Sequence, residues 1–159
     1  MKNQNLFSFD VEWNMQTIML FVALLILPNL LGMINITTAW GFKIHTFQFA
    51  IFVAAFIYGP TGGLASGIVG SIFSATMMGN PYILVGNAIL GLFAGIFIKY
   101  FPAVVAVWLA FLVQTPWLVL SDYYFMHMPL HVIGYLIIAL LISNTIWALP
   151  ASYITGRMK

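Results

Sequence analysis

Charged residues are scarce in this chain. Of its 159 residues, five are lysine or arginine and three are aspartate or glutamate, which together make 5% of the sequence. Soluble domains carry about 25% charged residues, so most of this protein's surface cannot face water. Five basic residues are also too few for a nucleic-acid-binding surface, where lysine and arginine cluster to neutralise phosphates. We therefore expect no nucleic-acid partner.

Cysteine is absent, which excludes disulfides, thiolate nucleophiles and cysteine metal sites. Catalytic motifs are missing as well: the sequence has no HExxH, no P-loop and no paired carboxylates, and Asp122 is the only carboxylate residue beyond the N-terminal segment. Proton-coupled transport needs buried ionisable residues, and this chain has very few to offer. The sequence predicts neither an enzyme nor a bound cofactor.

Long apolar stretches make up most of what is there. Hydrophobic residues account for 63% of the sequence, and no charged residue lies within residues 44–98, 100–121 or 123–156. A membrane-spanning helix needs about 20 mainly apolar residues, so these stretches have room for several spans. No linker or low-complexity tract divides the chain, and we expect one transmembrane domain over residues 1–159.

Turn signals divide the apolar stretches into six segments. Gly59-Pro60 and Gly79-Asn80-Pro81 are strong turns, and polar residues at 35–45 and 121–130 predict loops. Residues 1–14 mix aromatic and polar side chains and are expected to lie at the membrane surface. The sequence thus predicts an all-α bundle of six transmembrane helices, at residues 17–34, 46–58, 61–78, 82–98, 102–120 and 131–153.

Basic residues set the expected orientation. With the N-terminus inside, six spans place four of the five basic residues on the inner side and only Lys43 outside. The opposite orientation would satisfy the positive-inside rule for one residue of five. We therefore expect a multi-pass protein of the cell membrane with both termini inside. Most polar side chains then fall in the outer loops, where a ligand would bind.

Small residues line one face of two predicted helices. Gly63, Gly67 and Gly70 share a face of the third span, and Gly91 and Gly95 share a face of the fourth. Small residues four apart let helix backbones approach closely in lipid. Packing between helices of the same chain is the favoured interpretation, and docking of a partner helix is the alternative.

Two of these segments carry a family resemblance. Residues 58–71 (YGPTGGLASGIVGS) resemble the start of the third helix of the substrate-binding S components of energy-coupling-factor (ECF) transporters, which also show a Gly-Pro turn followed by spaced glycines. Residues 86–95 (GNAILGLFAG) are similar to their fourth helix. The chain length, the six predicted spans and the expected position of both termini agree with that family.

The resemblance implies a function. An S component has no ATPase activity and captures a vitamin or related micronutrient with high affinity at the outer face of the membrane. It works with a transmembrane T component and two cytoplasmic ATPase subunits, and it is thought to topple in the lipid bilayer to release its substrate inside.

Candidate binding residues gather around the predicted outer loops. Gln114 and Trp117 share a face at the end of the fifth span, and His127, His131 and Tyr135 are spaced to share a face at the start of the sixth. If both faces point into the bundle, aromatic rings would stack on a flat ligand and polar groups would hydrogen-bond it. The candidate substrate-binding residues are Trp40, Lys43, His45, Asn80, Gln114, Trp117, Asp122, His127, His131 and Tyr135.

These residues also have ordinary structural interpretations. Trp and Tyr at span ends commonly form interfacial belts, and Lys43 and Asp122 could be solvated loop charges. His127 and His131, four residues apart, could bind a metal, but Pro129 between them disfavours a regular helix across both. We expect no metal site.

Two other classes of function remain open from the sequence. A small scaffold or assembly protein would use the glycine faces to bind partner helices. A channel would need a polar face running through a helix, and the sequence shows none. If the chain captures a ligand, aromatic enrichment favours a flat heteroaromatic compound of thiamine, flavin or pterin type, and the few basic residues near the outer face disfavour a highly anionic one.

Overall fold

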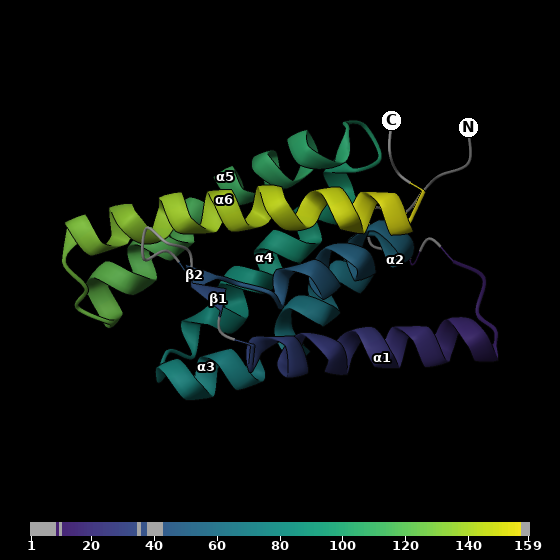
Figure 1. Ribbon diagram of the computed structural model, residues 1–159, viewed down its shortest axis with the longest axis horizontal. Coiled ribbons are helices and arrows are strands. Elements are labelled where there is room, and N and C mark those ends of the chain that lie inside the picture. Colours follow the sequence, from purple (N-terminus) through teal and green to yellow (C-terminus); the bar gives the residue numbers. More distant parts are fainter. Residues whose placement is uncertain (1–8, 10, 35, 38–42, 157–159) are drawn as a thin grey trace.

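The computed structural model (Figure 1) describes residue 9 and residues 11–34, 36–37 and 43–156. It is predominantly helical, which confirms the predicted class. The elements are α1 (Met15–Gly32), β1 (Ile36–Thr37), β2 (Lys43–Ile44), α2 (Gln48–Val69), α3 (Ile72–Met78), α4 (Tyr82–Phe97), α5 (Ala103–Leu120), the π-helix η1 (Ser121–Phe125) and α6 (Leu130–Ile154).

Several of these helices have the length and composition of membrane spans. Among the described residues, the helical runs Gln48–Met78, Ala103–Phe125 and Leu130–Ile154 are long and apolar enough to cross a bilayer. Met15–Leu31 and Tyr82–Phe97 are shorter apolar helices. The chain is therefore a helical membrane protein.

The chain reverses direction inside α2. Gly59 has φ 74° and ψ −161°, which is not a helical conformation. A β-carbon built on Gly63 would lie 2.8 Å from the β-carbon of Ala55, whereas residues eight apart in a continuous helix are separated by about 12 Å along its axis. The predicted Gly59-Pro60 turn is confirmed, and the two halves of α2 lie side by side.

The second half of α2 packs against α4 through glycine. Gly63 meets the backbone of Gly91, and Gly67 meets the backbone of Asn87. Gly95 faces the turn at Gly59, where its β-carbon would lie 2.6 Å from the carbonyl carbon. The helices run antiparallel, because residue numbers fall along α4 as they rise along α2.

All five glycines considered for partner binding are thus covered by helices of the same chain. Gly63, Gly67, Gly91 and Gly95 lie between α2 and α4, and Gly70 packs on Pro28 of α1. This is the packing within the chain that the sequence favoured, and it leaves these glycine faces closed to a partner helix.

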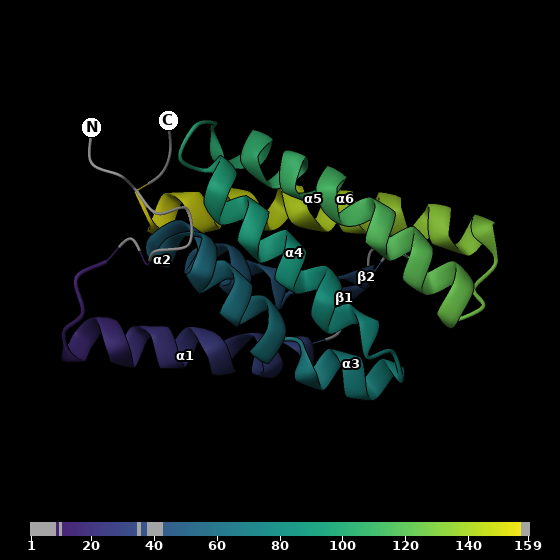
Figure 2. The ribbon, with the colours of Figure 1, turned by 180° about the vertical axis from the view of Figure 1, so that it is seen from behind.

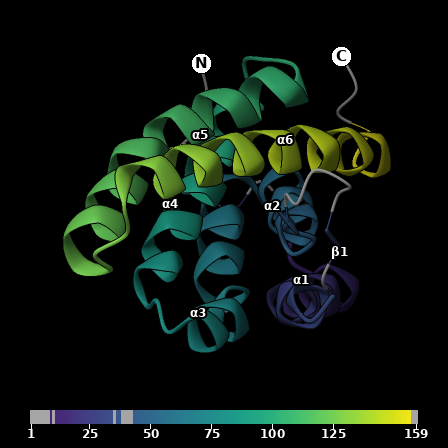
Figure 3. The ribbon, with the colours of Figure 1, turned by 60° about the vertical axis from the view of Figure 1, so that its left-hand side comes forward.

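The helices form layers around α2 and α4. Figure 3 shows α5 and α6 on one side of this central pair and α1 and α3 on the other. The first half of α2 supplies the most deeply buried large side chains, including Phe52, Phe56 and Tyr58. The beginning of α1 and the end of α6 lie at the same end of the molecule (Figures 1 and 2).

Several aromatic rings pack together at that end of the molecule. Phe9 contacts Trp13 and Phe21 edge to face, with ring centroids 4.9 and 5.5 Å apart, and Trp13 stacks on Tyr58 at 6.0 Å. The Tyr58 hydroxyl donates to the Thr17 carbonyl oxygen at 2.6 Å. The described part of the N-terminal segment therefore packs on the start of α1 and on the turn within α2.

A short β-hairpin lies toward the opposite end. β1 and β2 pair antiparallel, with Ile36 opposite Ile44, in a stretch where the sequence predicted only a loop. Just after β2, the backbone N–H of His45 donates to the Ser143 hydroxyl of α6 at 2.9 Å, and that hydroxyl donates to Gln48 Oε1 at 2.7 Å. These bonds fix the end of the hairpin to two helices.

Candidate functional site

A cavity lies toward the hairpin end of the molecule, between α3, α4, α5, η1 and α6. Its volume is about 80 Å³, enough for several water molecules. Its lining is mainly apolar, with a few polar groups. The lining residues are His45, Phe47, Ser74, Met78, Asn80, Tyr82, Ile83, Gly86, Asn87, Gln114, Trp117, Leu118, Ser121, Asp122, Met128, Leu136 and Leu140.

Asn80 and Asp122 form a buried polar pair at this cavity. The Asn80 side-chain N–H donates to Asp122 Oδ1 at 3.0 Å, and Asn80 Oδ1 accepts the backbone N–H of Tyr82 at 3.1 Å. Both side chains are 5% exposed. The left-handed C-cap of α3 at Gly79, with φ 61°, turns the chain so that Asn80 points back toward η1. The side-chain amide of Asn80 thereby joins the turn between α3 and α4 to the π-helix η1, which continues α5.

Asp122 is carried by a π-helical turn. η1 continues α5 directly, and its wider turn ends where the backbone N–H of Met126 donates to the Ser121 carbonyl oxygen at 3.1 Å. The Asp122 carbonyl oxygen in turn accepts the N–H of Met128 at 2.9 Å. Short π-helical turns occur frequently at functional sites, and here the turn brings a carboxylate into a largely apolar cavity.

Aromatic side chains form a fixed wall. The indole N–H of Trp117 donates to the Tyr82 carbonyl oxygen at 3.1 Å, which holds the indole in place. The Tyr82 ring stacks on Phe125 with centroids 4.7 Å apart and planes at 20°. The hydrogen bond from its indole N–H therefore fixes the orientation of Trp117, whose apolar ring surface lines the cavity.

Gln114 lies one turn of α5 before Trp117 and is 5% exposed. Its Oε1 is buried and has no hydrogen-bond partner in the described part of the chain. Its Nε2 lies 3.3 Å from the position that a β-carbon would take on Gly86. Burying an amide without a hydrogen bond costs about 1–3 kcal/mol in proteins, so a ligand or water that satisfied Gln114 would recover that free energy.

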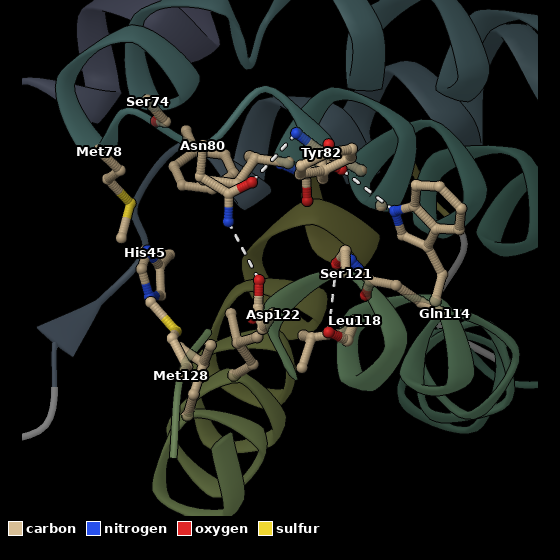
Figure 4. A pocket seen from close by; sticks show the side chains of 17 residues that line it. His45, Ser74, Met78, Asn80, Tyr82, Gln114, Leu118, Ser121, Asp122 and Met128 are labelled. Atoms are coloured by element: carbon tan, nitrogen blue, oxygen red, sulfur yellow. Dashed lines mark hydrogen bonds between the residues drawn. The ribbon is translucent and has the colours of Figure 1, made fainter. Parts of the chain in front are cut away.

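Other polar atoms at the cavity are already engaged. The Asn87 side-chain N–H donates to the Ser71 hydroxyl at 2.7 Å, and the Ser121 hydroxyl donates to the Leu118 carbonyl oxygen at 3.2 Å. In Figure 4, His45, Met78 and Met128 lie on one side of the Asn80–Asp122 pair, and Gln114 and Ser121 lie on the other. Within the described lining, the carboxylate and the unpartnered amide are the strongest polar groups.

The structure brings together half of the residues that the sequence singled out. Five of them line the cavity: His45, Asn80, Gln114, Trp117 and Asp122. Trp40 lies outside the described residues. Lys43 belongs to β2, and its side chain is likewise outside the description.

The face of α6 that carries His131 and Tyr135 is turned the other way from the expectation. His127 and His131 are exposed, and Tyr135 is 63% exposed. α6 begins at Leu130, and the residues that it presents to the cavity are Leu136 and Leu140. α6 is apolar on every side, so its sequence does not mark which face packs inward, and the packed face carries Leu136 and Leu140 in place of His131 and Tyr135.

The two histidines considered for a metal are not joined by one helix. His127 has φ 53°, outside α6, whereas His131 lies in the first turn of that helix. Among the described residues, no group of three histidine, aspartate or glutamate side chains is placed to hold a metal ion.

Sequence reasoning missed several lining residues. Tyr82 and Gly86 lie four apart on one face of α4, immediately after the Asn80 turn, so their closeness in sequence to Asn80 was a usable signal for both. Phe47, Met78 and Met128 carry no such signal, because apolar side chains in an apolar chain do not stand out.

Comparison of the chain with protein-family models, with curated proteins and with solved structures finds no match.

Proposed function

We propose that this chain is the substrate-capture subunit of an ECF-type importer and binds a vitamin or related micronutrient in the cavity. The observation that carries the proposal is the mainly apolar cavity itself, which is lined by the fixed ring of Trp117 and by a few polar side chains such as Gln114 and Asp122. An apolar cavity with a few convergent polar groups is the usual form of a small-molecule site. Such a site needs no catalytic group, in keeping with capture rather than chemistry.

The arrangement of the helices supports this topology. We infer six membrane crossings: α1, the two halves of α2 with α3 continuing the second half, α4, α5 and α6. Both termini then lie inside, and the cavity faces outside. Short apolar helices such as α4 can cross where the bilayer thins or where neighbouring helices pack around them.

Coupling to transport follows from the resemblance at residues 58–71 and 86–95. A transmembrane T component and two ATPase subunits would supply the energy for release. Co-purification of the tagged chain from its native membranes tests this part: a membrane protein and two ATPases should be recovered with it, and recovery of the chain alone would contradict it.

The alternative function, a scaffold or assembly protein, was suggested by glycine faces that could bind partner helices. The glycine faces that would have received partner helices are covered by α4 and α1 of the same chain. No other feature of the described residues favours that function.

Thermal stability of the detergent-purified protein against a panel of vitamins and their precursors tests capture. A ligand at a hundredfold excess over its Kd stabilises the folded state by about 2.7 kcal/mol. We expect one compound class to raise Tm, and Trp117→Ala to abolish the rise.

Trp108→Ala is the matched control. Trp108 lies on the same helix, is 45% exposed and donates its indole N–H to the Thr145 hydroxyl at 2.9 Å, away from the cavity. If the ligand raises the Tm of the Trp117→Ala variant as much as the Tm of the Trp108→Ala variant, the ligand binds elsewhere and the proposal is wrong.

A further inference from the structure

A second and larger cavity, which we call the hairpin chamber, lies between the end of α1, the β-hairpin and α3. It is lined by Gly32 and Met33 at the end of α1, by Ile44 of β2, and by Ser74 and Met77 of α3. Its volume is about 360 Å³. Small-molecule sites usually measure about 300–1,000 Å³, so the chamber reaches this range, whereas the cavity beside Trp117, at about 80 Å³, does not.

The chamber and the smaller cavity lie on either side of one wall. His45, Phe47, Ser74 and Met78 line both spaces, and Figure 4 shows Ser74, Met78 and His45 along one side of the smaller cavity. Met78 is 53% exposed, and the unbranched side chain of methionine adapts readily to its surroundings. Movement of this side chain is therefore the simplest change that joins the two spaces.

Ser74 supplies a hydroxyl group to this wall. Its side chain is 8% exposed, and its hydroxyl has no hydrogen-bond partner among the residues that the structure describes. Its Oγ lies 3.1 Å from the position that a β-carbon would take on Gly32, where the end of α1 meets α3. A buried hydroxyl gains free energy when it is hydrogen-bonded, so Ser74 favours a compound with a polar group at this point.

The lining of the chamber also limits the charge of a ligand. Among the described residues that form it, none is lysine, arginine, aspartate or glutamate, and His45 is the one titratable side chain. An isolated charge is costly to bury without a partner. Three methionines, at positions 33, 77 and 78, contribute soft apolar surface that fits varied shapes. The chamber therefore suits an uncharged compound that is mainly apolar.

We infer that the hairpin chamber is the larger part of the ligand site and holds a neutral, mainly apolar compound whose hydrogen-bonding group contacts Ser74. One end of this compound reaches the smaller cavity past Met78. This inference rests on the proposed function. It goes beyond that function by assigning the space between α1 and α3 to the site and by specifying the charge of the ligand.

Access to the chamber can be measured with single cysteines, because the chain has none of its own. The detergent-purified Ser74→Cys protein is treated with neutral methyl methanethiosulfonate or with anionic 2-sulfonatoethyl methanethiosulfonate, and intact mass spectrometry follows the rate of modification. Met77→Cys, at a side chain that lines the chamber but is 70% exposed, is the reference for each reagent. Ser66→Cys, at a residue that is 0% exposed and lines neither space, gives the background.

We expect the neutral reagent to modify Ser74→Cys well above that background. The ratio of the neutral to the anionic rate should be about tenfold or more higher at Ser74→Cys than at Met77→Cys, because only the former requires a charge to enter the chamber.

Occupancy is tested with the compound of the vitamin panel that raises the Tm of the wild-type protein. Gly32→Leu places a side chain in the chamber beside Ser74 and should abolish this rise, whereas Gly134→Leu, where a β-carbon meets no atom within 4 Å, should retain it. Modification of folded Ser74→Cys with benzyl methanethiosulfonate fills the same space after folding and should also abolish the rise. The test therefore does not depend on the folding of Gly32→Leu.

The outcomes separate this inference from the function on which it rests. If a panel compound raises Tm and Trp117→Ala abolishes the rise, but the rise persists in Gly32→Leu or after benzyl modification, capture stands and the chamber is not part of the site. Modification of Ser74→Cys at the background rate would show that the chamber is closed. Equal rate ratios at Ser74→Cys and Met77→Cys would overturn the assigned charge. If no panel compound raises Tm, the proposed function is contradicted, and this inference fails with it.

Discussion

Gly63 of α2 and Gly91 of α4 touch through their backbones, and a β-carbon on Gly63 would lie 2.6 Å from the carbonyl carbon of Gly91. Real β-carbons do not come so close to a carbonyl carbon, so the approach requires glycine. This contact sets the distance between the two central helices, and the cavity lies beyond it toward the hairpin end.

Replacing Gly63 with alanine should therefore force α2 and α4 apart. We expect Gly63→Ala to lower the free energy of unfolding by about 3 kcal/mol, as for overpacking of a well-packed interior. Denaturation of the protein in detergent measures the change. Gly134→Ala is the control, because a β-carbon there meets no atom within 4 Å, and a similar loss in both variants would contradict the close packing.

The turn within α2 makes a different demand on glycine. Gly59, with φ 74° and ψ −161°, has a conformation that is essentially restricted to glycine, whereas Gly79, with φ 61° and ψ 23°, is left-handed helical and tolerates asparagine. Gly59→Asn should destabilise the protein by about 1–3 kcal/mol, and Gly79→Asn should cost much less. Equal thermal stability of the two variants would show that the chain does not reverse at Gly59 in this way.

The bond between Asn80 and Asp122 stabilises a buried carboxylate. Asn80→Ala leaves Asp122 without its side-chain donor, and we expect a loss of about 1–3 kcal/mol. Asp122→Ala combined with Asn80→Ala should cost less than the sum of the two single changes, because the lost bond is counted once. Denaturation of the four proteins of this cycle measures the coupling, and strict additivity would mean that the two side chains do not interact.

The inferred topology can be measured directly because the chain has no cysteine. Tyr100, between α4 and α5, is 71% exposed, and Tyr124 in η1 is 65% exposed, so each tolerates replacement by cysteine. In intact cells a membrane-impermeant maleimide should label Tyr124→Cys, and should label Tyr100→Cys only after permeabilisation. Labelling of both from outside would refute a crossing by α5.

Turns and helix contacts could be read from the sequence because they depend on local chemistry. Gly59-Pro60 and Gly79-Asn80-Pro81 restrict the backbone wherever they occur, and glycines four apart lie on one helix face by geometry alone. The β-hairpin was not predicted, since strands of two residues leave no periodic pattern.

The cavity was only partly predictable. Gln114, Trp117 and Asp122 stood out because polar and aromatic side chains are rare near apolar spans, and the structure places all three at the cavity. The rotation of α6 could not be read, because in a chain that is apolar all round no face of a helix is marked as inward. Consequently His131 and Tyr135 were expected in the cavity, but they are exposed.

Native mass spectrometry of the protein purified from its own membranes in a mild detergent tests the central claim most directly. The account predicts one small organic molecule per chain, in a 1:1 complex, and predicts that Gly86→Leu loses it by filling the cavity beside Gln114 while Gly134→Leu, on the open face of α6, keeps it. If wild-type protein and both variants carry the same lipid adducts and nothing else, even after incubation with the vitamin panel, the chain is not a capture subunit.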